Sequence, residues 1–178
     1  MSKVSYTATT LAILQTLAQD PEKRLHTRKV AEKAKVSVGA ASMILRELEG
    51  SHLLEMEEMG GMKVYRLNLD NPVAREFKIL FNVSGLNDLV ASLKESADKI
   101  ILFGSASEGT DTGESDLDLF ILTSEPKTAR IALRGFREHS SGSLSPIIAT
   151  PVEWARLRRR DRPLYESISR GKVLWERT

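Results

Sequence analysis

Two short groups of residues near the middle of the chain have the types and spacing to do chemistry. Gly104 and Ser105 follow the apolar run Ile100–Phe103, and Asp116 and Asp118 come after ten intervening residues. Glycine lets the backbone approach a ligand closely, and a serine hydroxyl beside the free N–H groups at the start of a helix can hold a phosphate. Two carboxylates can hold a cation. Together the two groups predict a site for a phosphate ligand and a metal ion.

The two aspartates are predicted to project from one face of a strand. Leu117, Leu119 and Ile121 alternate with them, and side chains two positions apart on a strand share a face, with backbone origins about 6–7 Å apart. Two like charges at that separation repel by roughly 2–3 kcal/mol at an effective dielectric near 20, which a bound cation would relieve. Because the site offers carboxylate oxygens and no histidine or cysteine, the expected cation is Mg²⁺ or Mn²⁺ and not zinc.

The segment resembles the signature of the nucleotidyltransferase superfamily that includes DNA polymerase β and the minimal nucleotidyltransferases. In that signature a strand ends in Gly-Ser and, about ten residues later, Asp-x-Asp begins the next strand; here these are Gly104-Ser105 and Asp116-Leu117-Asp118. The resemblance covers residues 98–178 and implies a small mixed-sheet domain. It also implies that Gly104 and Ser105 bind a nucleoside triphosphate, and that Asp116 and Asp118 are metal ligands and catalytic residues.

The sequence departs from the family pattern at one place. Catalytic members carry a third carboxylate, a metal ligand and base, on a later strand, which corresponds here to Ser143–Ala149, after a helix near Lys127–Glu138. That strand contains no acid, and Glu153 just beyond it is the nearest substitute. General-base catalysis commonly contributes about 10²–10⁴-fold to a rate. We therefore expect binding of metal and nucleotide with very slow turnover or none.

The first 70 residues predict a separate domain, mainly helical and ending in a hairpin. Leucines recur at helical spacing up to Pro21, Thr27 and Ser37 are suited to cap two further helices, and Gly60-Gly61 supplies the positive φ that a tight hairpin needs. This order of elements resembles a winged helix-turn-helix domain, which implies binding to double-stranded DNA. The alternative is a helical domain of the same topology that binds a protein or binds nothing.

The resemblance places DNA contacts on the third helix and near the hairpin. Ser37, Ser42 and Arg46 lie on the exposed face predicted for that helix, and Arg28 and Lys63 are available for phosphates. So few cations imply modest affinity for a single chain, and we expect a homodimer to bind DNA.

Residues 71–97 predict a helical linker with Leu86, Leu89, Val90 and Leu93 on one stripe. The stripe fits packing on the second domain or on another subunit, and the sequence does not choose between them.

The C-terminal part of the chain is basic. Five arginines lie within residues 156–162. They fit either a solvated helix face or a surface for a triphosphate, a nucleic acid or an acidic partner.

Composition narrows the class of protein. The 178 residues are 41% hydrophobic and 28% charged with a net charge of +2, which is ordinary for a soluble globular protein. The two resemblances together imply an α+β fold class. The absence of cysteine excludes disulfides, thiolate metal sites and cysteine nucleophiles. No apolar run approaches the ~18 residues of a membrane span, so we expect no membrane partner and a cytoplasmic location.

Two functions fit these observations. The first is a DNA-binding transcriptional regulator whose second domain binds a metal–nucleotide with weak or no transfer activity. The alternative is an active Mg²⁺-dependent nucleotidyltransferase, antitoxin-like, that adenylylates a toxin-like partner protein.

Overall fold

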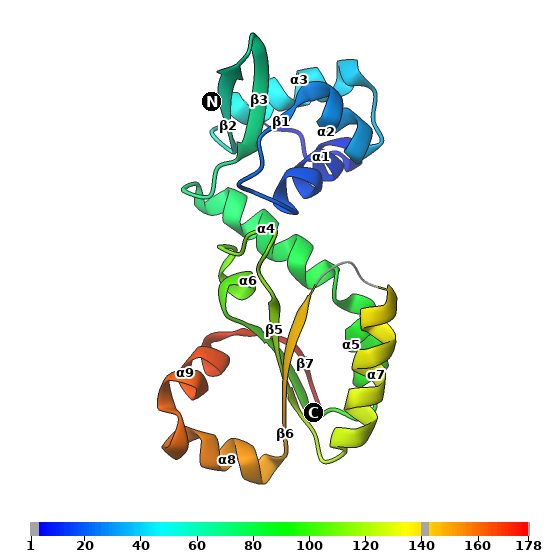
Figure 1. The fold of residues 1–178 in the computed structure, drawn as a ribbon, viewed down its shortest axis with the longest axis vertical. Helices are drawn as coiled ribbons and strands as arrows, with labels where there is room; N and C mark the ends of the chain where they lie inside the picture. The colour runs from blue at the N-terminus through cyan, green and yellow to red at the C-terminus, as the bar shows by residue number, and fades with distance from the viewer. Residues whose placement is uncertain (1–3, 140–142, 178) are drawn as a thin grey trace. The chain divides into compact units, whose positions relative to one another are not determined.

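The structure is a computed structural model that describes residues 4–139 and 143–177. The chain divides into two compact units, residues 1–81 and 82–178, drawn in Figure 1. In the described residues no helix is long and apolar enough to cross a membrane.

The N-terminal unit has the order helix, short strand, helix, helix, hairpin. Its β1 and β2 both pair antiparallel with β3, giving the sheet order β1-β3-β2. These elements are α1 (Ala8–Ala18), β1 (Leu25–His26), α2 (Thr27–Ala34), α3 (Val38–Gly50), β2 (Leu54–Met59) and β3 (Met62–Leu67). The three helices and the hairpin lie where the sequence predicts them.

Two of the helix starts show how the local sequence sets the fold. The Ser37 hydroxyl accepts the Ala40 N–H at 3.2 Å, so the predicted cap of α3 is confirmed. The prediction that Thr27 caps α2 is wrong. His26 takes that place because its Nδ1 accepts the Lys29 N–H at 3.2 Å, and Thr27 is already the first helical residue.

The hairpin turns on two glycines with left-handed backbone conformations. Gly60 has φ 58° and Gly61 has φ 75°, and Met59 pairs directly with Met62. Two successive positive φ values match the right-handed twist of a two-residue hairpin and favour glycine at both positions. The predicted Gly-Gly turn is confirmed.

The core of the N-terminal unit draws on all its helices and on residues beyond position 70. Ala74 of α4 (Pro72–Ser84) is completely buried in this core, and Phe77 and Phe81 pack against it. The buried residues from the other elements include Ile13, Leu14, Leu17, Val30, Leu45, Leu48 and Tyr65. The helix that follows the hairpin is therefore part of the same hydrophobic core.

The C-terminal unit is built on a four-stranded mixed sheet of order β6-β5-β4-β7. The strands β5 and β6 pair in parallel, whereas β4 pairs antiparallel with both β5 and β7. Its elements after α4 are α5 (Asn87–Leu93), β4 (Lys99–Phe103), α6 (Ser105–Glu108), β5 (Leu117–Leu122), α7 (Pro126–His139), β6 (Leu144–Ala149), α8 (Pro151–Arg160), α9 (Arg162–Arg170) and β7 (Lys172–Glu176).

Helices cover both faces of this sheet, with α5 and α7 on one side and α8 and α9 on the other (Figure 1). On the first face, Leu119 and Ile121 of β5 pack in the cluster that contains the stripe Leu86, Leu89, Val90 and Leu93. The stripe thus packs within the C-terminal unit. On the second face, Phe120 packs in a cluster with Trp154 and Ile168. This alternation along β5 fixes the direction of Asp118 at its start.

Candidate nucleotide and metal site

The turn between β4 and α6 accepts only glycine at its first position. Gly104 has φ 67° and ψ −160°, a combination open essentially to glycine. A Cβ at this position would lie 2.5 Å from Oδ2 of Asp118. The carboxylate of Asp118 is therefore held against a bare stretch of backbone, in the register that pairs Phe103 with Asp118.

The two aspartates lie at the start of β5, where its parallel pairing with β6 begins. Asp118 is the second residue of the strand and is half-buried, while Asp116 is exposed and lies one residue before the strand. Alternation puts Asp118 on the same face as Phe120. Neither carboxylate has a hydrogen-bond or ion-pair partner among the described residues. Both are consequently available to a cation.

Ser105 lies beside the turn, in the first position of α6. Its side chain is half-buried and has no partner among the described residues. The helix is a single turn, ended by Gly109 in the left-handed conformation, with the Gly109 N–H donating to the Ser105 carbonyl. The structure places Gly104, Ser105 and Asp118 together, as the sequence predicts for a ligand site.

Contacts that the sequence did not reveal hold this loop in place. Asn82 Nδ2, near the end of α4, donates to the Ala106 carbonyl at 3.0 Å and to Oδ1 of Asp111 at 2.9 Å. The Ser107 hydroxyl donates to the Gly104 carbonyl at 2.8 Å. Asp111 is 5% exposed, and a buried carboxylate needs such partners. No local pattern in the sequence joins Asn82 to a residue 29 positions away.

A serine of the neighbouring strand lies beside Asp118. Asp118 pairs in parallel register with Ser145 of β6. Leu144 and Ile148 pack on the α5–α7 face while Ile147 packs on the other, so Ser145 shares the face of Asp118. The hydroxyl beside Asp118 carries no charge, and it can neither replace a carboxylate as a metal ligand of equal strength nor act as a base at neutral pH.

Glu153 does not fill this gap, because it closes the first turn of α8. Its Oε2 accepts the Thr150 N–H at 2.7 Å and the Thr150 hydroxyl at 2.8 Å, completing a capping box. These hydrogen bonds from the Thr150 backbone and side chain hold the pKa of Glu153 below its ordinary value. Thr150 lies five residues beyond Ser145 along an extended strand, about 16 Å away. Glu153 is therefore at the opposite end of β6.

The donor set fits Mg²⁺ or Mn²⁺. In the described residues, no group of three or more His, Cys, Asp or Glu side chains could hold a metal ion, so this part of the chain offers at most two carboxylates to a cation at the site. Mg²⁺ commonly uses one or two carboxylates and takes its other oxygens from water and substrate phosphates. The phosphates of a nucleotide beside Ser105 would supply oxygen ligands to a metal ion held by Asp116 and Asp118.

The residues proposed for DNA contacts fall into two groups in the N-terminal unit. Arg28 and Lys63 line one hollow of about 520 Å³ together with His26, Thr27 and Met62.

The other group lies on α3. Ser42 and Arg46 are occupied with each other, since Arg46 Nε donates to the Ser42 carbonyl at 3.1 Å, and Ser37 serves as the helix cap. Arg46 is exposed on the helix surface. Its guanidinium can leave this weak local contact for a stronger acceptor.

The hairpin next to this surface carries acids, most of which are neutralised. Glu55 pairs with Arg66, and Glu57 pairs with Arg24 at 2.8 Å. Glu58 lies opposite Lys63 in the hairpin register. With Lys63 included the hairpin is thus close to neutral, and Arg28 of α2, which lines the same hollow as Lys63, adds positive charge beside it.

The mixed sheet, the glycine turn and the aspartates beside it define a nucleotidyltransferase-type domain. The family model described as polymerase beta, nucleotidyltransferase matches residues 87–178, and the chain belongs to this family. Among solved structures, human N-acetylserotonin methyltransferase in complex with SAM is similar at 22% identity and a TM-score of 0.31, over 51% of this chain and 30% of that one. The search of curated proteins gave no match.

Proposed function

We propose that the C-terminal unit binds a nucleoside triphosphate together with Mg²⁺ or Mn²⁺, and transfers its nucleotidyl group very slowly or not at all. The observation that carries the proposal is the strand register: Gly104 lies against Asp118 on one side, and Ser145 lies beside Asp118 on the other. The first contact supports binding. The second supports weak chemistry.

The roles of the individual residues follow from this arrangement. Gly104 lets the phosphates approach the backbone, and the Ser105 hydroxyl donates to a phosphate oxygen. Asp116 and Asp118 hold the cation, which when bound would neutralise charge on the phosphates. An acceptor hydroxyl would find no carboxylate on β6 to take its proton, since the residue there is Ser145. The bound nucleotide would therefore persist.

Calorimetry on the full-length chain tests the binding step. Asp116→Asn with Asp118→Asn should abolish Mg²⁺-dependent nucleotide binding, because two ligand charges are removed while the side-chain shapes stay. A matched control, Asp88→Asn with Glu95→Gln, changes the same charge at two exposed positions of the same unit and should bind as wild type does. Equal affinity in the site variant and the control would refute the proposal.

An active nucleotidyltransferase that adenylylates a partner protein is the second candidate. What favours it is the complete Gly-Ser turn and aspartate pair, with the Ser105 and aspartate side chains free of competing partners in the described part of the chain. Incubation of the protein with each labelled nucleoside triphosphate and Mg²⁺, with and without cell lysate, separates the two candidates. A labelled macromolecule formed by wild type, and not by the Asp116→Asn, Asp118→Asn variant, would favour the transferase.

We infer further that the N-terminal unit is a winged helix-turn-helix that binds duplex DNA as a homodimer, and that the whole chain acts as a transcriptional regulator. The support is the element order, the hollow that brings Arg28 and Lys63 together, and the exposed Arg46 on α3. Cations at such positions contact phosphates or base edges.

A mobility-shift assay on duplexes that include the upstream region of the gene tests this inference. Arg46→Ala should weaken binding by about 5- to 100-fold, since a good groove contact contributes about 1–3 kcal/mol. Lys127→Ala, an exposed cation in the other unit, is the control. Absence of any shift at low salt would rule out a DNA-binding role, and sedimentation analysis would report whether the chain dimerises.

A further inference from the structure

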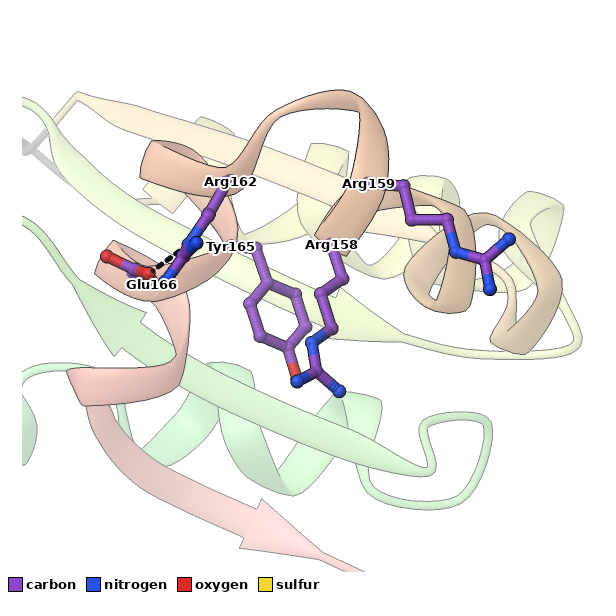
Figure 2. A pocket seen from close by; sticks show the side chains of 5 residues that line it. All are labelled: Arg158, Arg159, Arg162, Tyr165 and Glu166. Atoms are coloured by element: carbon purple, nitrogen blue, oxygen red, sulfur yellow. Dashed lines mark hydrogen bonds and ion pairs between the residues drawn. The ribbon is translucent and has the colours of Figure 1, made fainter.

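Helices α8 and α9 form a pocket of about 570 Å³ at the surface of the C-terminal unit. Arg158, Arg159, Arg162, Tyr165 and Glu166 line it, and we call it the arginine pocket. Figure 2 shows the Arg158 guanidinium beside the hydroxyl end of Tyr165, with Arg162 turned toward Glu166 and Arg159 on the far side of Arg158. None of these residues has a part in the nucleotide site described above.

An aromatic stack supports the pocket from beneath. Tyr165 stacks on Trp154, with ring centroids 4.5 Å apart, and Trp154 lies against Phe120 of the sheet at 4.6 Å. This chain of rings fixes Tyr165 to the core, so its position does not depend on the ligand. A rigid aromatic ring held beside arginines loses little conformational entropy when a planar group stacks on it.

Most of the arginines around the pocket are not paired with an acidic side chain of the described residues. Residues 151–170 contain six arginines and three acids. Each acid is engaged: Glu153 with Thr150, Asp161 with the Leu164 N–H at 3.1 Å, and Glu166 with Arg162 at 2.7 Å.

Unlike these acids, the three arginines at the end of α8 are not engaged by other described residues. Arg158, Arg159 and Arg160 have no hydrogen-bond or ion-pair partner in the part of the chain that the structure describes. Positive charges in the last turn of a helix interact favourably with its dipole, which accounts for a cation there but not for a pocket lined by several guanidinium groups.

The basic surface extends past this pocket. A second hollow of about 530 Å³ shares Arg159 and adds Arg156, Pro151, Val152 and Ala155. The two hollows together offer guanidinium groups on both sides of α8. A single phosphate group would use one of them, whereas a chain of phosphates would use both.

We propose that the arginine pocket and its extension along α8 bind a single-stranded nucleic acid. Arg158 and Arg159 would contact successive phosphates, Arg162 would exchange Glu166 for a phosphate oxygen, and Tyr165 would receive a base. Every cation in these helices is arginine, whose planar fork matches a phosphate bidentately. A basic groove with an aromatic platform is how proteins bind single strands without reading sequence. An acidic peptide would match the charge but leave Tyr165 without a role.

The experiment is fluorescence anisotropy with the full chain and a labelled oligouridine of about 16 nucleotides, long enough for one site, titrated with salt. Arg158→Gln with Arg159→Gln should bind at least about tenfold more weakly. It should also reduce the steepness of log K against log salt by about 1.4, since each single-strand phosphate contact contributes about 0.7.

Two controls isolate the arginine pocket. Lys94→Gln with Lys127→Gln makes the same charge change at exposed positions on α7 and after α5, and should leave binding and salt slope unchanged. Arg158→Lys with Arg159→Lys keeps the charge at the end of α8 and removes the forks, so it should bind with intermediate affinity. Because it preserves the helix dipole interaction, it remains informative if the glutamine variant is unstable.

Two further probes distinguish the ligand class. An abasic strand of the same length should bind about 5- to 150-fold more weakly than oligouridine, since stacking on one aromatic side chain contributes about 1–3 kcal/mol. Polyglutamate should bind far more weakly than either. The proposal would be overturned if polyglutamate bound as tightly as oligouridine, or if no binding occurred at low salt. It would also be overturned if the glutamine variant and the Lys94→Gln, Lys127→Gln control gave equal slopes of log K against log salt. None of these results depends on Mg²⁺ or nucleotide binding at Asp116 and Asp118.

Discussion

Placing a carboxylate on β6 should raise the rate of nucleotidyl transfer at the proposed nucleotide site. Ser145 is in register with Asp118 and on the same sheet face, so Ser145→Asp would place an acid beside Asp118, on the strand expected to carry the third carboxylate. Adjacent strands are about 4.8 Å apart. The new charge would repel Asp118 by about 3 kcal/mol at an effective dielectric of 20, less where water reaches the half-exposed side chains.

This repulsion predicts how stability should depend on metal. Without divalent cation, Ser145→Asp should lower the melting temperature, by up to about 12–24 °C if the full repulsion is felt, because 1 kcal/mol shifts a domain of this size by about 4–8 °C. Adding Mg²⁺ should recover most of the loss in this variant and change wild type less. Calorimetric melting in EDTA and in Mg²⁺, with Ser145→Asn as the uncharged control, measures the difference.

The same substitution should raise the rate of nucleotidyl transfer. A correctly placed base commonly contributes about 10²–10⁴-fold, so a gain of at least about 10²-fold over wild type is expected with Mg²⁺ and labelled nucleotide. Ser145→Asn should show no gain. If Ser145→Asp is folded and binds Mg²⁺ more tightly, yet transfers no faster than Ser145→Asn, then the assignment of this strand position as the missing catalytic carboxylate is refuted.

Three further substitutions probe the supports of the site. Gly104→Ala should weaken Mg²⁺-dependent nucleotide binding by more than about tenfold in calorimetry, because the backbone conformation there costs an alanine about 1–3 kcal/mol and the methyl group would displace the aspartate beside it. Asn82→Ala should remove two hydrogen bonds of about 0.5–1.5 kcal/mol each, which chemical denaturation would report, and weaken nucleotide binding by loosening the loop at Asp111. Glu153→Gln should leave any transfer rate unchanged and lower the melting temperature at neutral pH. Since the Thr150 hydrogen bonds lower the pKa of Glu153, its stabilisation is complete above the unfolded-state pKa and lost as pH falls through the folded pKa, so circular dichroism melts of the two proteins should converge in acid.

The sequence predicts those parts of the fold that depend on neighbouring residues. The Gly60-Gly61 hairpin and the Ser37 cap follow from a few adjacent side chains, and both are confirmed. The glycine turn at position 104 is also predicted from adjacent residues, because Gly104 directly follows the apolar residues of the buried strand β4. The cap at His26 was missed because an imidazole can accept a backbone N–H, although hydroxyl and carboxylate side chains are the usual caps.

The rest of the site depends on pairing between distant segments. The register of Asp118 with Ser145 is set by the parallel pairing of β5 and β6 across the whole of α7. The absence of an acid on β6 could be read from the sequence, but which serine stands beside Asp118 could not. The sequence also does not predict the role of Glu153. Whether this acid points toward the site or caps α8 depends on the angle at which α8 starts after β6.

The residues that α4 contributes to the N-terminal core determine where the chain can be cut to prepare each unit by itself. The division of the chain falls after residue 81, inside this helix, while Ala74 and Phe77 belong to the N-terminal core. A fragment that stops at residue 70 would leave a hole in that core, and one that starts at residue 98 would lose Leu86, Leu89 and Leu93 from the other. Fragments cut at the hairpin or at the first strand should aggregate on expression, whereas an overlapping pair that each retain residues 72–84 would keep both cores whole.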